Sequence, residues 1–111
     1  MDQAITYRDT LTKVMREEGK YQPKHGPPIV SVCDQETGQF LLVAVGWQNG
    51  QNARHVDSIL FHAQLLDRKV IIETDKTEEG LTPALIEAGI PEEDIISGSA
   101  LRKLEAETVA V

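Results

Sequence analysis

Hydrophobic residues recur every three or four positions across residues 4–18, which is the spacing of one face of an α-helix. Charged residues fill many of the other positions in this stretch. Asp2 is placed to cap the start of the helix, and Gly19 is the residue type that most easily adopts the left-handed conformation at a helix end. We therefore predict an amphipathic helix whose apolar positions are Ala4, Tyr7, Leu11, Val14 and Met15.

From residue 29 the pattern changes to short apolar runs rich in β-branched residues and separated by turn-forming residues. The turn signals are Asp34–Gly38, Asn49-Gly50 and Asp67-Arg68. Strands joined by turns this short pair with one another in an antiparallel arrangement. The predicted strands are Ile29–Cys33, Phe40–Trp47, Ala53–Leu65 and Lys69–Thr74.

Alternation along Ala53–Leu65 assigns its side chains to two faces of the sheet. His55, Asp57 and Ile59 fall on one face, together with the odd-numbered residues that follow them. His62 lies seven positions after His55 and therefore falls on the opposite face. Only a β-bulge between the two histidines would change this prediction.

A short helix is predicted over Pro83–Ala88, after the last of these strands. Thr82 is placed to cap it, a proline follows at the first helical position, and Gly89 ends it. Pro91–Asp94 indicates one more helical turn, with its acidic residues at the favourable N-terminal end.

The end of the chain predicts a helix over Leu101–Glu107 and an extended segment over Thr108–Val111. With no repeat or linker in between, residues 1–111 form a single domain. The predicted fold class is α+β: an antiparallel sheet of four or more strands, with an N-terminal helix and short C-terminal helices packed on it.

Composition narrows the possible partners. The chain carries 18 acidic and 11 basic residues, a net charge of −7, and the excess of acids lies almost entirely in residues 67–111. Binding to nucleic acid or to an anionic membrane needs clustered Lys and Arg, so this excess of acidic residues argues against both.

The single cysteine, Cys33, excludes an internal disulfide, and no apolar run has the length of a signal peptide or a membrane span. We expect a soluble, cytoplasmic protein.

His55, Asp57 and His62 form the only cluster that suggests a metal or catalytic centre. Their spacing does not bring them to one point, and Cys33 has no surrounding motif that would make it a nucleophile. The acidic turn that contains Glu78 and Glu79 lacks the alternating pattern of a calcium loop. We therefore expect no metal, no cofactor and no catalytic residue.

An ordered series of short motifs carries a family resemblance. It runs from Val45-Gly-Trp47 through the strand that contains His62 to Lys69-Val-Ile-Ile72, and continues with Thr77-Glu-Glu-Gly80 and Gly89-Ile-Pro-Glu-Glu-Asp-Ile95. The series resembles the XisI family, the fdxN element excision controlling factors of cyanobacteria. The chain differs from the family pattern at Arg68, where the family often has glycine, and at Ile71, where it often has an aromatic residue.

The resemblance implies a small accessory protein that controls a DNA rearrangement, the excision of the fdxN element during heterocyst differentiation. It also implies a XisH-like, nuclease-like partner. On this basis we expect a non-enzymatic regulatory protein that acts through protein contacts. A homodimer is expected because small sheets with exposed edges or apolar faces often self-associate.

The alternative is a small enzyme or ligand-binding domain with a pocket near Trp47, His55 and His62. Tryptophan can stack on a ligand, and histidine can transfer protons near neutral pH. Trp47 and the two histidines are therefore candidate pocket residues, and Glu78 and Glu79 are candidate interaction residues.

Overall fold

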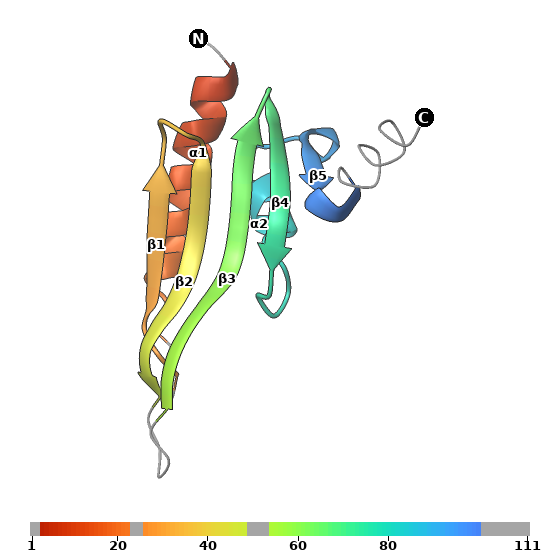
Figure 1. The fold of residues 1–111 in the computed structure, drawn as a ribbon. Coiled ribbons are helices and arrows are strands. Elements are labelled where there is room, and N and C mark those ends of the chain that lie inside the picture. Colours follow the sequence, from red (N-terminus) through yellow and green to blue (C-terminus); the bar gives the residue numbers. More distant parts are fainter. Residues whose placement is uncertain (1–2, 23–25, 49–53, 101–111) are drawn as a thin grey trace.

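The computed structural model describes residues 3–22, 26–48 and 54–100, and its element order agrees with the predicted α+β fold. One five-stranded sheet has its strands in the sequence order β1-β2-β3-β4-β5. Figure 1 shows helices α1 and α2 on the same side of this sheet. The elements are α1 (Gln3–Gly19), β1 (Ile29–Asp34), β2 (Gln39–Gln48), β3 (Arg54–Leu66), β4 (Lys69–Asp75), α2 (Thr82–Glu87), the 3-10 turn η1 (Glu92–Asp94) and β5 (Ile95–Ser97).

Strands β1 to β4 form the predicted antiparallel meander. The two-residue turn between β3 and β4 is made by Asp67 and Arg68, which both adopt positive φ values of 51° and 65°. Paired positive φ values are what a tight hairpin turn of the I′ type requires, and its twist matches that of the flanking strands. A turn without glycine therefore joins β3 to β4.

The core lies between α1, α2 and the covered face of the sheet. Leu11 and Met15 of α1, Leu85 of α2 and the sheet residues Phe40 and Phe61 are all completely buried. Four of the five apolar positions predicted for α1 therefore pack in the core, with Val14 at 9% exposure on the margin; they are Tyr7, Leu11, Val14 and Met15. The side chain of Ala4, the fifth, lies outside the described ones.

Strand β5 was not predicted. It pairs in parallel with β4, with Val70 opposite Ile95 and Ile72 opposite Ser97. The turn η1 just before β5 places Asp94 beside α1, where its carboxylate accepts a hydrogen bond from the hydroxyl of Tyr7. Lys69 donates a second hydrogen bond to Asp94, with Nζ 2.7 Å from Oδ1. These contacts connect the first helix to the last described strand.

The predicted division of β3 into two faces is wrong beyond residue 59. Leu42 pairs with Phe61 whereas the next residue, Val43, pairs with Ile59, so Leu60 has no partner in β2. This β-bulge shifts the alternation by one residue. Phe61 consequently points into the core, while Ile59 is 43% exposed on the other face.

Two further predictions are corrected or lie outside the described residues. Thr82 is the first residue of α2 and not its cap, because Leu81 occupies the N-cap position. The predictions that rest on Asp2, on Asn49-Gly50 and on residues 101–111 lie outside the described ranges.

Strands β2 and β3 extend beyond the rest of the sheet (Figure 1). The pairing of β1 with β2 ends at Ala44, and the amide of Val45 makes one more hydrogen bond, to the carbonyl of Pro28 at 3.1 Å. Among the described residues, Trp47 and Gln48 then pair only with β3. The radius of gyration is 15.7 Å, whereas a compact domain of this length has about 13 Å. The long β2–β3 hairpin is one source of this elongated shape.

Candidate functional site

The face of the sheet opposite the helices carries the three residues that the sequence singled out as pocket candidates. Trp47 lies directly across from His55 in the β2–β3 register, and their ring centroids are 5.1 Å apart with planes at 74°. Trp47 is 63% exposed. The two rings therefore form an edge-to-face pair at the surface.

His62 lies on the same face as His55, contrary to the sequence prediction, because the bulge at Leu60 reverses the alternation between them. His55 pairs with Trp47 and His62 pairs with Leu41, six residues earlier along β2. At about 3.3 Å per residue, the two histidines are separated by about 20 Å. The side chains of His55 and His62 therefore do not meet at one point on this face.

His62 belongs instead to a row of polar side chains that crosses three strands. Its Nε2 lies 2.7 Å from Oε1 of Gln39, and Nε2 of Gln39 donates to Oε1 of Gln64 at 3.1 Å. Gln64 in turn donates to Glu73 at 3.3 Å. These hydrogen bonds give the polar side chains of the row partners, beside the apolar residues of the same face.

Within the described ranges, no three His, Cys, Asp or Glu side chains come together in a way that would hold a metal ion. Cys33 is half-buried on β1, and burial raises the pKa of its thiol against the opposing effect of Arg16. A raised pKa leaves less thiolate, the reactive form, at neutral pH.

Glu78 and Glu79 lie in the loop between β4 and α2, which is fixed by Asp75. Oδ1 of Asp75 accepts hydrogen bonds from the backbone and the hydroxyl of Thr77, and Oδ2 accepts one from the amide of Leu81 at 2.8 Å. Gly80 has a φ of 77°, which an L side chain rarely adopts. The two exposed glutamates therefore extend from a turn whose backbone is held at both ends.

The turn forms one wall of an acidic groove, which we define by the carboxylates of Glu18, Glu78, Glu79 and Glu87. The groove is a cavity of about 580 Å³ between the end of α1 and the start of α2. Tyr21, 66% exposed, also lines it, and no basic residue does. The remaining lining residues are Thr77, Gly80, Leu81, Pro83 and Ala84.

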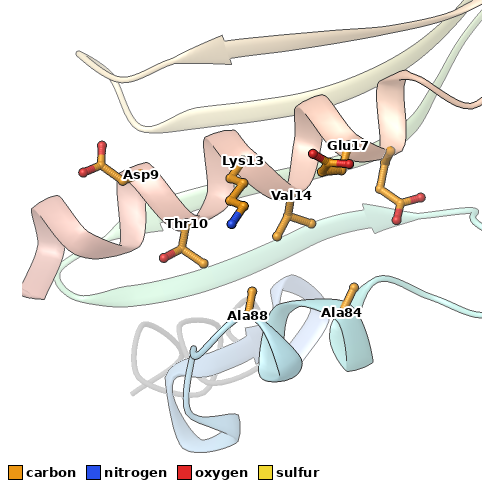
Figure 2. Close-up of a pocket in the computed structure, with 8 residues that line it drawn as sticks. Asp9, Thr10, Lys13, Val14, Glu17, Ala84 and Ala88 are labelled. Atoms are coloured by element: carbon orange, nitrogen blue, oxygen red, sulfur yellow. The ribbon is translucent and has the colours of Figure 1, made fainter.

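A second cavity, of about 370 Å³, continues from the groove between α1 and α2 (Figure 2). Glu18 and Ala84 belong to both cavities. Figure 2 shows side chains of α1 on one side and the small side chains of Ala84 and Ala88 on the other. Asp9 and Glu17 add negative charge here, and Lys13 adds one positive charge. The charged residues that line the two cavities are therefore acidic, with Lys13 as the one exception.

A third cavity, of about 290 Å³, lies beside Glu18, Tyr21 and Glu78. Its other lining residues are the apolar Ile29, Leu42 and Leu60, together with Lys76 and Thr77, so a basic side chain lies next to the groove. None of the three cavities is lined by Trp47, His55 or His62.

Sequence reasoning identified Glu78 and Glu79 as interaction candidates but missed Glu18, Tyr21 and Glu87. These residues come from two helices that are far apart in the chain. Charge on the polar face of an amphipathic helix is ordinary, so only the packing of α1 beside α2 distinguishes Glu18 from other surface acids.

The fold defines a small α+β domain with helices on one face of a mostly antiparallel sheet. Comparison with protein families shows that residues 1–108 match the XisI protein family. The chain therefore belongs to the XisI family. Within the ranges that the structure describes, every helix is too short or too polar to cross a bilayer. A comparison with curated protein sequences found no match.

Two solved structures from Anabaena variabilis are similar to this chain. A XisI-like protein superposes with a TM-score of 0.71 at 21% sequence identity, over 84% of each chain. The fdxN element excision controlling factor XisI superposes with a TM-score of 0.66 at 26% identity, over 86% of this chain and 85% of the other. The fold that the resemblance implied is confirmed.

Proposed function

We propose that this protein is a non-enzymatic accessory factor that takes part in the control of excision of a DNA element, and that it acts by binding a basic segment of a protein partner in the acidic groove. Family membership and the similarity to the fdxN element excision controlling factor support the excision role. The observation that carries the mode of action is the groove with its four carboxylates and no basic lining residue.

The chemistry of the groove selects a cationic partner. Glu78 and Glu79 are exposed and project from a fixed turn, so a Lys or Arg side chain can approach them without reorganising the loop. The exposed ring of Tyr21 offers a guanidinium group a stacking surface of the cation–π kind. The net charge of −7 also accelerates the encounter with a basic protein.

A XisH-like nuclease is the partner that we propose. A protein that cuts DNA must present clustered Lys and Arg side chains to the phosphate backbone. An acidic groove that binds some of those side chains competes with DNA for them. The accessory factor would thus hold the nuclease inactive, or keep it folded, until excision is required.

Co-purification with the XisH-like protein at low salt tests the proposal. We expect a complex whose dissociation constant rises steeply with salt, because exposed ion pairs are screened. The double variant Glu78→Gln/Glu79→Gln should weaken the complex by about tenfold, at roughly 0.5–1 kcal/mol for each exposed pair.

The matched control is Glu92→Gln/Glu93→Gln, which changes the net charge equally at two exposed acids that do not line the acidic groove. The control should leave the affinity within about twofold, because its charges lie outside the contact. Equal weakening by both pairs would show a response to net charge alone and contradict the groove as the binding site. Failure of the two proteins to associate at low salt would contradict the partner.

A further inference from the structure

We propose that the sheet face opposite the helices is the interface of a symmetric dimer with a second copy of this chain. The proposal concerns a different surface from the acidic groove and does not depend on the proposed function. We define the open face by its seven apolar residues: Val30, Val32, Leu41, Val43, Val45, Trp47 and Ile59.

The register places these residues in one continuous patch. Val43 lies between Val30 on β1 and Ile59 on β3, so a row of β-branched side chains crosses three strands. Three of the seven side chains are between 43% and 45% exposed, namely those of Val30, Val32 and Ile59. Neither α1 nor α2 covers the seven residues, because both helices pack on the other face (Figure 1). Ile71 of β4, which the register also places on this side, is buried at 3% exposure and lies outside the patch.

The β2–β3 extension gives a second, independent indication. The amide of Val45 still donates to the carbonyl of Pro28, but beyond it Trp47 and Gln48 pair, among the described residues, only with β3. A two-stranded hairpin alone is marginally stable in water. Trp47, the only tryptophan of the chain, stands on this extension with 63% of its surface exposed. A sheet packed against the open face would cover Trp47 and support the extension.

The size of the open face suits a weak to moderate dimer. Same-face residues about 6.7 Å apart along strands about 4.8 Å apart occupy about 32 Å² each. Six apolar residues other than Trp47 and six polar neighbours therefore give about 380 Å², and the exposed part of Trp47 adds about 100–150 Å². Two copies together bury about 1,000 Å², the lower limit of specific protein–protein interfaces. The polar neighbours are Asp34, Gln39, His55, Asp57, His62 and Gln64.

Charge favours a second copy as the occupant. Each copy carries −7, so two copies repel each other wherever acidic surfaces meet. The seven apolar residues of the open face are uncharged, and only two of their six polar neighbours, Asp34 and Asp57, are acidic. The open face therefore carries less charge than the acidic groove with its four carboxylates, and two copies approach here at lower cost. Two such sheets can pack face to face with their strands nearly aligned, and a two-fold axis then pairs the same patch with itself.

Sedimentation velocity over about 1–500 µM tests the dimer, and emission from Trp47 reports on the interface in the same samples. We expect reversible dimerisation with a dissociation constant in the micromolar range, and a blue shift of the emission that follows the dimer fraction. Added salt should strengthen the dimer, since it screens the repulsion between two acidic copies. Binding in the acidic groove should respond to salt in the opposite way, which separates the two proposals.

Ile59→Lys and Val30→Lys should weaken the dimer at least tenfold by placing a charge in the apolar row. The matched control is Ile86→Lys, because Ile86 is 40% exposed on α2, away from the open face. It should dimerise like the wild type. If a lysine variant does not fold, Val30→Thr/Val32→Thr retains β-branched side chains and should still weaken the dimer.

Three outcomes would overturn the proposal. One is a chain that stays monomeric throughout the concentration range with Trp47 open to quenchers. Another is a monomer in which Trp47 is already protected from quenchers. That result would mean that a segment of the same chain, and not a second copy, covers the open face. The third is a dimer that Ile59→Lys and the double threonine variant leave unchanged, which would place the interface elsewhere.

Discussion

The hydroxyl of Tyr7 and the carboxylate of Asp94 are joined by a hydrogen bond across a sequence separation of 87 residues. Tyr7 is almost completely buried at 3% exposure, and Asp94 also accepts a hydrogen bond from Lys69. The pair holds the N-terminal helix, the β4 strand and the turn before β5 in one arrangement.

Removal of the Asp94 charge should destabilise the protein at neutral pH. The hydrogen bonds from Lys69 and then from Tyr7 hold the pKa of Asp94 below its ordinary value. The folded state therefore releases this proton more readily than the unfolded state, whose carboxyl titrates near pH 3.9. The stabilisation is present above about pH 4 and is lost as the pH falls through the folded-state pKa.

Urea unfolding of wild type and Asp94→Asn measures this effect. We expect a lower midpoint for Asp94→Asn at pH 7 and convergence of the two curves under acid. Glu93→Gln makes the same change in net charge at the neighbouring position and should unfold like the wild type. A difference between wild type and Asp94→Asn that stayed constant down to pH 2 would show that the charge of Asp94 contributes nothing.

Gly46→Ala should destabilise the protein by about 1–3 kcal/mol, the usual range for a residue held in an unfavourable backbone region. Gly46 has a φ of 135°, and an added Cβ would lie 2.9 Å from Cδ of Pro28. Thermal unfolding measures the loss. The double variant Gly46→Ala/Pro28→Ala separates the two causes, because it relieves the contact and leaves the backbone strain. Recovery of full wild-type stability in the double variant would mean that the positive φ costs nothing.

The thiol of Cys33 should react more slowly with iodoacetamide at pH 8 than a cysteine in the unfolded chain. Burial raises the pKa of Cys33, and the positive charge of Arg16 partly opposes this. Arg16→Gln removes the opposing charge and should slow the reaction further. The control is the same protein in urea, where both variants should react at one rate. A folded protein that reacts as fast as the unfolded chain would contradict the prediction.

Asp75→Ala should release the loop that carries Glu78 and Glu79. The substitution removes the acceptors for Thr77 and for the amide of Leu81, which we expect to cost about 1–2 kcal/mol. Hydrogen exchange at the Leu81 amide should become faster. Asp75→Asn keeps one oxygen acceptor and should have an intermediate effect. Unchanged exchange at Leu81 in Asp75→Ala would show that the loop is held by other contacts.

The helix and the four antiparallel strands could be predicted because each has a strong internal pattern. The face of α1 follows from its 3.6-residue period, and the strands follow from β-branched runs between turn residues. The bulge at Leu60 could not be predicted, because the run Ile59-Leu-Phe61 is apolar at every position and is compatible with either alternation. Tertiary packing of Phe61 in the core decides between them.

The parallel strand β5 and the acidic groove had no local signal. Three residues are too few to show a strand period, and parallel pairing depends on a crossover whose path the sequence does not specify. The groove combines Glu18 with Glu78 and Glu87 only after α1 and α2 have packed. The sequence shows the acidic turn at Glu78 and Glu79, but it does not show that Glu18 and Glu87 lie close to this turn.

The arrangement of the core also bears on how the chain folds as it leaves the ribosome. Helix α1 is synthesised first, yet the buried residues that pack with it include Leu85 and Ile90 near the other end of the chain. Its apolar face therefore has no complete set of packing partners until Ile90 has emerged. Final folding of α1 must then follow the synthesis of nearly the whole domain, and a nascent chain stalled before that point would expose Leu11 and Met15 to chaperones.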